Sequence, residues 1–361
     1  MKRILLLSGY DAKSHRYWRR HLASQFPDVQ WTVLALPDRH FSWRMGGNSF
    51  NFAANHESTL IQNFDQVVAT SMTDLCGLFG LFPHLAQIPN SLYFHENQMA
   101  YPASKDQPDV LHYQLNSIKS AMAAKQLIFN SIYNKNSFLT GVKKIEQLVP
   151  DGFPKQLYKL LESKSHVIPV PLSEDCFNHK LKSNKQPRPL TITWNHRWEY
   201  DKGPETLLQV IALCQKELPD IRFNVIGQQF RQSPDVFKAI QTKYGQLIKH
   251  WGYIERRTDY LNVLSRSDII LSTALHEFQG LAVMEAVAQG CVPLLPDRLA
   301  YPNFYAKDYL YQGTLNNPKK EAIRIVEQLK RWQKNLPQAP DMSCFSWAQM
   351  KHQYQDIIIN N

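Results

Sequence analysis

The chain has few cysteines and no long apolar run. Its five cysteines are odd in number and widely scattered, so they indicate neither a disulfide framework nor a C-x-x-C metal site. Apolar runs such as residues 4–7 and 269–271 fall far short of the roughly 20 residues that a membrane-spanning helix needs. No internal repeat or low-complexity segment is present. These absences argue against a membrane-spanning, a disulfide-rich or a repeat protein, and we expect a cytoplasmic location.

Length, composition and charge indicate a globular protein of two domains. The 361 residues are about twice the length of a typical domain. Hydrophobic residues make up 43% and charged residues 20%, as in ordinary globular proteins. The formal net charge of +10 points to a polyanionic partner or an anionic surface.

Short apolar segments alternate with helical segments along the whole chain, which predicts an α/β protein with a parallel sheet in each half. In the first half the predicted strands are 4–7, 31–35, 66–70, 91–94, 127–129 and 167–170. In the second half they are 190–194, 222–226, 248–251, 269–272 and 292–295. Charge returns at Asp11 and Lys13, so residues 1–9 are predicted to form a buried strand and not a signal peptide. The polar, basic stretch 178–189 is predicted to link a domain of residues 1–177 to one of residues 190–340.

Two glutamates, Glu277 and Glu285, flank a predicted loop-to-helix junction with seven residues between them. Strand 269–272 precedes the loop, Gly280 is predicted to turn the chain, and a helix begins at Leu281. The first amide N–H groups of such a helix can face an anion. One acid can then meet sugar hydroxyls and the other a ribose, with a diphosphate between them. The alternative is an exposed loop acid and an ordinary surface glutamate on the helix.

Two cations, Arg197 and Lys202, fall on one predicted loop between strand 190–194 and a helix that begins near Pro204. Two cations that converge on a diphosphate neutralise both its charge and the charge that grows on a leaving group. A solvated basic loop is the alternative, and spacing alone does not separate the two.

The acidic pair resembles the E-x7-E signature of retaining glycosyltransferases with the GT-B fold, of the family 4 type, and the basic pair resembles the diphosphate clamp of the same family. The resemblance implies two Rossmann-like, doubly wound domains that face each other across a cleft, with a C-terminal helix in 341–361 that crosses back to the first domain. It implies that Glu277 contacts the transferred sugar, Glu285 the ribose, and Arg197 and Lys202 the diphosphate. Further donor contacts are implied for Gly252, Tyr253, Ile254, Phe278, Gln279, Gly280 and Leu281.

Basic and aromatic residues interleave in two clusters of the first half, at 13–21 and 39–44. Such residues pair with phosphates while their rings stack on exposed bases. For the first cluster the alternative is an ordinary amphipathic helix, with Trp18 and Leu22 on its buried face and the arginines on its solvent-exposed face. The second cluster directly follows the second strand and is predicted to be a loop over the cleft that binds RNA through Arg39, His40, Trp43 and Arg44.

A third polar segment, His95, Glu96, Asn97 and Gln98, follows the strand at 91–94. Met99 excludes an H-E-x-x-H zinc motif, and no convincing metal cluster stands elsewhere in the sequence. The alternative is that His95 only packs in the protein interior or caps a neighbouring element and has no functional role.

Four segments, 36–45, 93–102, 195–205 and 276–285, together resemble the tRNA-queuosine alpha-mannosyltransferase family over most of the chain. The resemblance implies transfer of mannose from GDP-mannose to the cyclopentenediol of queuosine in the anticodon of tRNA(Asp), with no cofactor, no metal, no membrane and no obligatory protein partner. It implies that His95 contacts the sugar. It assigns Ser14 and His15 to the donor, and Glu96, Asn97 and Gln98 to the acceptor. The sequence departs from the family in one loop, where Ala12 and Lys13 replace a glycine pair.

Two other functions stay open. The same donor domain would serve a transferase that acts on a lipid or a polysaccharide, but the first half lacks a broad amphipathic helix with a lysine-rich rim of the kind that docks on membranes. A non-catalytic RNA-binding protein on a transferase scaffold is the other alternative. The presence of both glutamates and both cations argues against it.

Overall fold

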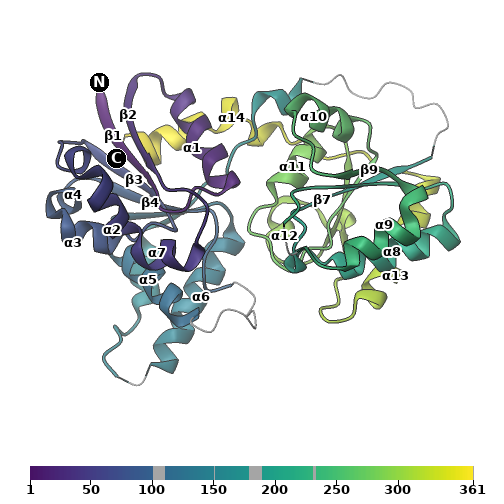
Figure 1. Ribbon diagram of the computed structural model, residues 1–361, viewed down its shortest axis with the longest axis horizontal. Coiled ribbons are helices and arrows are strands. Elements are labelled where there is room, and N and C mark those ends of the chain that lie inside the picture. Colours follow the sequence, from purple (N-terminus) through teal and green to yellow (C-terminus); the bar gives the residue numbers. More distant parts are fainter. Residues whose placement is uncertain (101–109, 150, 179–188, 231–232, 361) are drawn as a thin grey trace. The chain divides into compact units, whose positions relative to one another are not determined.

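The computed structural model describes residues 1–100, 110–149, 151–178, 189–230 and 233–360. It divides into two compact units, Met1–Pro171 with Trp347–Asn361, and Leu172–Ser346 (Figure 1). The segments 101–102 and 179–188, which contain part of the family resemblance and most of the predicted linker, lie outside the described residues.

The first unit is built on a six-stranded sheet in the order β2-β1-β3-β4-β5-β6, and its strand pairs are parallel. Parallel sheets are covered on both faces, which explains why the strand at residues 4–7 is apolar at every position and fully buried. The strands are β1 (Lys2–Ser8), β2 (Val29–Ala35), β3 (Gln66–Thr70), β4 (Asn90–Phe94), β5 (Gln126–Phe129) and β6 (Ser165–Val167).

Helices α3 and α6 of the first unit begin where a polar side chain satisfies one of the first amides. Asp74 accepts a hydrogen bond from the amide of Gly77 at the start of α3, and Ser131 accepts one from Asn134 at the start of α6. The helices are α1 (Lys13–Gln25), α2 (Phe41–Leu60), α3 (Leu75–Leu81), α4 (Pro83–Gln87), α5 (Val110–Ala123), α6 (Ile132–Leu148) and α7 (Leu157–Ser163).

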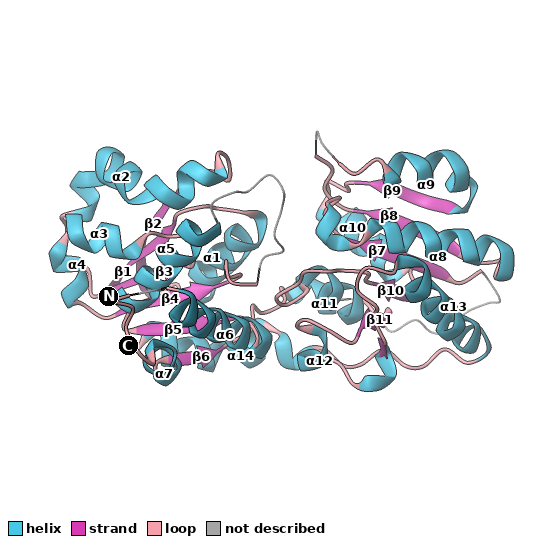
Figure 2. Cartoon of the chain, turned by 90° about the horizontal axis from the view of Figure 1, so that it is seen from below, coloured by secondary structure: helices cyan, strands magenta, loops and turns pink. Residues whose placement is uncertain are grey.

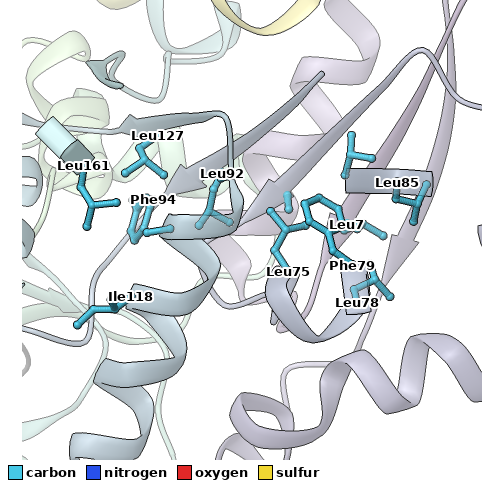
Figure 3. Close-up of a cluster of buried hydrophobic side chains, with 14 of the residues drawn as sticks. Leu7, Leu75, Leu78, Phe79, Leu85, Leu92, Phe94, Ile118, Leu127 and Leu161 are labelled. Atoms are coloured by element: carbon cyan, nitrogen blue, oxygen red, sulfur yellow. The ribbon is translucent and has the colours of Figure 1, made fainter. Parts of the chain in front are cut away.

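The core of the first unit lies between one face of its sheet and the helices α2 to α7. Leu7, Leu92, Phe94 and Leu127 from the strands belong to one cluster with side chains of α3, α5 and α7 (Figure 3). The chain's last helix, α14 (Trp347–Tyr354), and the turn Gln355–Ile359 belong to the same unit. Tyr354 fixes α14 there, because its hydroxyl accepts a bond from Trp18 Nε1 at 3.1 Å in α1.

The second unit has a six-stranded sheet in the order β12-β11-β10-β7-β8-β9, again with parallel pairs. Helices α8, α9 and α13 cover one face, and α10 and α11 cover the other (Figure 2). The strands are β7 (Thr191–Asn195), β8 (Arg222–Ile226), β9 (Ile248–Gly252), β10 (Ile269–Leu271), β11 (Val292–Pro296) and β12 (Leu310–Tyr311). The α-helices are α8 (Pro204–Glu217), α9 (Val236–Tyr244), α10 (Arg257–Ser265), α11 (Leu281–Ala288), α12 (Tyr301–Phe304) and α13 (Pro318–Lys334). Short 3₁₀ turns are Glu174–Phe177, Tyr200–Lys202, Gly245–Leu247, Lys307–Tyr309 and Ser343–Phe345.

The strand order of the second unit reverses between β7 and β10, which are neighbours in the sheet. In doubly wound sheets, ligands bind beside the carboxyl ends of the strands at such a switch point. The loops that leave β7 and β10 are the two loops on which the sequence places Lys202 and Glu277. The fold therefore brings the predicted basic and acidic pairs to one end of one sheet.

Most predicted strands are confirmed within one or two residues, and the predicted α/β class with two doubly wound units is confirmed. The strand predicted at 167–170 is wrong, because β6 ends at Val167. The two-residue β12 was not predicted. The loop predicted at 39–44 is also wrong, because α2 begins at Phe41. Two glycines weaken the helical propensity of this segment, and the burial of Met45, Asn48 and Phe52 outweighs that effect.

Candidate active site

The loops after β7 and β10 are joined by short hydrogen bonds. The carbonyl oxygen of Asp201 accepts bonds from the amides of Leu275 at 2.8 Å and His276 at 3.1 Å. Thr273 Oγ1 donates to the carbonyl oxygen of Lys202 at 2.8 Å. Gly203 has φ 65°, and a Cβ there would lie 2.2 Å from the carbonyl oxygen of Thr273. Only glycine permits so close a contact between the two loops.

Lys202 is the buried cation of this junction. Its Nζ donates to the carbonyl oxygen of His276 at 2.7 Å. The same atom lies 3.2 Å from Asp201 Oδ2 and 3.5 Å from Glu277 Oε2. The structure thus brings Lys202 and Glu277 together.

The charges at the junction shift two neighbouring pKa values. Burial raises the pKa of Glu277, but the positive charge of Lys202 and of other neighbours outweighs it, so the pKa lies below its ordinary value. Burial and the charge of Lys202 lower the pKa of His196 to about 4. Glu277 is therefore an anion and His196 a neutral ring at physiological pH.

Arg197 lies on the same loop as Lys202 but is bonded differently. Its Nη2 is 2.9 Å from Glu199 Oε2, and the side chain is about half exposed. Its charge still contributes to the lowered pKa values of Glu277 and His196. The structure places Arg197 within electrostatic reach of the junction.

Helix α11 begins at Leu281, shortly after Glu277, and its N-cap residue is Gly280. Gly280 has φ 84° in the left-handed region, and a Cβ there would lie 3.0 Å from the ring of Tyr301. Gly280 has no side chain to cap the helix, and no acid lies in its first turn. Leu281 is the first residue of the helix, and Phe278 and Gln279 lie in the loop before it. Such an end attracts anions.

Glu285 is buried inside α11 and accepts two short hydrogen bonds. Arg257 Nη1 donates to Oε1 at 2.6 Å, and the hydroxyl of Tyr260 donates to Oε2 at 2.7 Å. Asn195 at the end of β7 donates to the hydroxyl of Tyr260 at 2.8 Å. The thiol of Cys176 also lies 4.0 Å from Oε1. A carboxylate has about four acceptor positions, so these three donors leave about one for a ligand.

Arg257 links Glu285 to a second acid, Asp175. Its Nε and Nη2 donate to the two oxygens of Asp175 at 2.8 Å and 3.1 Å. The hydrogen bonds from Arg257 lower the pKa of Asp175 to about 2. The sequence alone does not identify this arginine as a site residue, because its partners are far away in the chain. Its one sequence signal is its position shortly after the predicted donor residues 252–254.

The predicted donor contacts at residues 252–254 begin at the last residue of β9. Gly252 ends the strand with φ 91°, and its carbonyl oxygen accepts a bond from the amide of Gly227 at 3.1 Å. Tyr253 is exposed, and Ile254 packs against the hydrophobic cluster beside α10 and α11. These residues lie on the loop that leads into α10 and Arg257.

In the first unit, His15 and His95 are stacked inside the protein. Their ring centroids are 4.3 Å apart, and His15 Nε2 lies 3.1 Å from Glu96 Oε1. Both ring nitrogens of His95 are buried without a hydrogen-bond partner in the described part of the chain. Burial, and then the nearby His15, keep the pKa of His95 well below its usual range. The carbonyl oxygen of His95 accepts a bond from Asn130 at 2.8 Å.

Asn97 and Gln98 hold their own loop together. Asn97 Nδ2 donates to Asn134 Oδ1 at 2.7 Å and to Ser137 Oγ at 2.9 Å, and its Oδ1 accepts from the amide of Met99. Gln98 Nε2 lies 3.8 Å from the sulfur of Met72. Ser14 is partly buried in the first turn of α1. The predicted ligand contacts of these residues stay predictions.

The predicted RNA-binding residues gather at the start of α2. Arg39 and His40 are exposed, and His40 has φ 55° in the left-handed region. Trp43 and Arg44 lie in the first turn. In contrast, Arg16 and Arg19 of the other basic cluster both bond to Asp11, at 3.0 Å and 2.7 Å. Those two arginines therefore have a structural role.

Among the described residues, no group of three or more His, Cys, Asp or Glu side chains could hold a metal ion. In the same part of the chain, no helix has the length and apolar character to span a membrane.

Comparison with solved structures identifies the fold. Sucrose-phosphate synthase from Thermosynechococcus elongatus is 13% identical with a TM-score of 0.71, and the match covers 100% of both chains. HepE from Anabaena, solved with UDP, is 14% identical with a TM-score of 0.69, again over 100% of both. At these identities the likeness shows the fold alone, and that fold is the predicted GT-B fold.

Sequence comparison then identifies the family. Residues 3–172 match the model described as tRNA-queuosine alpha-mannosyltransferase N-terminal, and residues 177–343 match glycosyl transferases group 1. The tRNA-queuosine alpha-mannosyltransferase of Drosophila melanogaster is 32% identical over 367 residues, which are 98% of this chain and 96% of the relative. The chain belongs to the tRNA-queuosine alpha-mannosyltransferase family and is a glycosyltransferase. The predicted family is confirmed.

Proposed function

We propose that this protein transfers mannose from GDP-mannose to the cyclopentenediol of queuosine in the anticodon of tRNA(Asp), in the cytoplasm and with retention of configuration. The observation that carries the proposal is the 32% identity to the fruit-fly relative over 98% of the chain, which spans both units. The junction of Lys202, Glu277 and the amino end of α11 supports the chemistry.

The donor is held in the second unit. Lys202 and the first amides of α11 face the diphosphate, and Arg197 adds positive charge from the rim. Charges fixed before the reaction stabilise a leaving group without reorganisation. Because Lys202 is bonded to the backbone at His276, its ammonium is already in place when the donor binds.

Transfer proceeds on one face of the sugar. The bond between the anomeric carbon and the phosphate oxygen breaks while an acceptor hydroxyl forms the new bond on the same face, and the hydroxyl proton passes to the departing phosphate oxygen. Glu277 contacts the sugar hydroxyls, and its negative charge stabilises the positive charge that develops at the anomeric carbon. His95 is assigned to the sugar, and its lowered pKa keeps it neutral there. Glu285 holds the ribose.

The acceptor is held by the first unit, where Arg39, His40, Trp43 and Arg44 meet at the start of α2. The net charge of +10 favours association with RNA. We further propose that the reaction needs no metal, because Lys202 and helix amides take the place of a bridging cation at the diphosphate. Transfer that survives EDTA supports this, and loss that magnesium or manganese restores overturns it.

The test is incubation of the purified protein and queuosine-containing tRNA with GDP-mannose, or with UDP-glucose, followed by mass spectrometry of the nucleosides. The expected product is queuosine heavier by one hexose, formed with GDP-mannose only. The control is the same tRNA with guanine in place of queuosine, which offers no cyclopentenediol and should gain no sugar. Equal transfer to the control tRNA, or transfer to a lipid acceptor alone, would overturn the proposal.

A further inference from the structure

Trp43 is an exposed aromatic side chain in the first turn of α2, with 57% of its surface open to solvent. Its six-membered ring lies against Gly47, one turn further along the helix. A Cβ at position 47 would be 2.8 Å from two ring carbons and 3.0 Å from a third. Such distances are too short for real side-chain contacts, so this position of the ring requires glycine at 47.

A glycine inside a helix costs about 1 kcal/mol relative to alanine. Gly47 is buried in the middle of a 20-residue helix, and its φ does not lie in the left-handed region. Backbone conformation therefore does not explain the residue. What its missing side chain provides is room for the ring of Trp43.

The next residue, Arg44, adds a buried positive charge. It is only 7% exposed, and among the described residues its Nε and Nη1 have no hydrogen-bond acceptor. Burying a guanidinium without hydrogen-bond acceptors costs free energy, and a bound ligand that accepts its hydrogen bonds would offset this cost. Arg44 itself lies in the first turn of α2, and long helical side chains generally lean toward the amino end of their helix.

The amino end of α2 also favours an anion. His40 provides no side-chain cap, and no acidic residue lies in the first turn. Free amides at a helix start attract negative groups. The first turn of α2 thus combines an exposed ring, a helix start without a side-chain cap from His40, and a buried cation with two nitrogens that lack an acceptor among the described residues.

We propose that Gly47 seats Trp43 as a stacking platform for one nucleobase of the acceptor RNA, and that Arg44 with the first turn of α2 receives a phosphate of the same strand. The inference rests on the proposed function and assigns its acceptor contact to particular residues. Aromatic rings stack on any base, while arginine binds phosphate oxygens through two parallel bonds. The charge of this turn favours RNA over an apolar partner.

The first experiment compares Gly47→Ala with Gly46→Ala. Both changes raise helix propensity equally, but a Cβ at 46 would meet only His112 Nε2 at 3.5 Å, an ordinary contact. We expect Gly47→Ala to raise the KM for queuosine tRNA by between about fivefold and 100-fold, the range for loss of one stacked base. Gly46→Ala should leave it unchanged, and the KM for GDP-mannose should be unchanged in both. Equal effects of the two changes would overturn the role of Gly47.

The second experiment replaces the ring itself. Trp43→Phe keeps a smaller stacking surface, whereas Trp43→Leu keeps only an apolar one. We expect tRNA use to fall in the order tryptophan, phenylalanine, leucine, with circular dichroism unchanged. Equal activity of the two variants would contradict stacking, since a merely apolar contact is expected to affect both variants alike.

If all four variants use tRNA normally while the wild-type protein still modifies queuosine, the inference fails and the proposed function stands. If the wild-type protein does not modify queuosine tRNA, the proposed function itself fails.

Discussion

The ammonium of Lys202 lies 3.5 Å from the carboxylate of Glu277, yet its shortest bond, at 2.7 Å, is to the carbonyl oxygen of His276. The lysine is therefore held by the backbone of the loop and not mainly by the acid. Its charge stays in place whatever Glu277 contacts. This relationship permits the two residues to act on different parts of one donor, the lysine on the diphosphate and the acid on the sugar.

Replacing Lys202 by methionine should lower turnover at least ~100-fold, the cost of losing one preorganised electrostatic contact in a transition state. The measurement is turnover under saturating GDP-mannose and queuosine tRNA. Lys238→Met is the matched control, since Lys238 pairs with Asp235 on the exposed surface and should have wild-type activity. Full activity of Lys202→Met in a protein with native circular dichroism would remove the lysine from the diphosphate site.

Arg257→Lys should weaken donor binding more than turnover. A lysine cannot reach Asp175 and Glu285 with a planar fork of donors, so Glu285 would lose its fixed position at the ribose. A contact that persists through the reaction affects ground and transition states alike, and we expect the KM for GDP-mannose to rise about tenfold with kcat nearly unchanged. Arg256→Lys is the control, because Arg256 pairs only with exposed Asp259. A fall in kcat without a change in KM would contradict the assignment.

The regular strands were predictable from the sequence for a simple physical reason. Strands β3 and β8 have the bounds predicted for them, since central parallel strands are short apolar runs between polar turns. The edge strand β12 has two residues and leaves too little pattern to recognise. Helix α2 was taken as a loop at its start because packing of its later residues, and not the composition of its first turn, decides its conformation.

The site was predictable only where its residues lie on one local segment. Lys202 and Glu277 lie close to Pro204 and Gly280, residue types that are typical of a helix start. The family resemblance indicated that the two loops belong to one site. Arg257 has no such signal, because its two acidic partners lie 82 and 28 residues away in the sequence. Two features are properties of packing and need coordinates: the ring nitrogens of His95, which lack a hydrogen-bond partner among the described residues, and the contact between Trp43 and Gly47.

Stability should fall on acidification through the two buried histidines. The pKa of His196 is lowered to about 4 by burial and Lys202, and that of His95 lies well below its usual value. Below about pH 6.5 the unfolded chain binds protons that the folded protein does not, so each histidine removes up to about 1.4 kcal/mol per pH unit. The expected result is a declining free energy of unfolding from pH 6.5 toward pH 4 in urea titrations. His196→Asn should make this decline shallower, and an identical slope would contradict the assignment.

The final prediction separates binding from stability at Arg44. Arg44→Met removes a buried guanidinium that lacks a partner among the described residues, and replacing such a charge by an apolar side chain is neutral or stabilising. The same change should weaken tRNA binding and reduce the slope of log affinity against log salt by about 1, as loss of one phosphate contact does. Arg19→Met is the opposite control, because Arg19 bonds to Asp11 at 2.7 Å and its loss should lower stability without changing the salt slope. Urea unfolding and filter binding at several salt concentrations measure both quantities. An unchanged slope with Arg44→Met would show that Arg44 does not meet a phosphate.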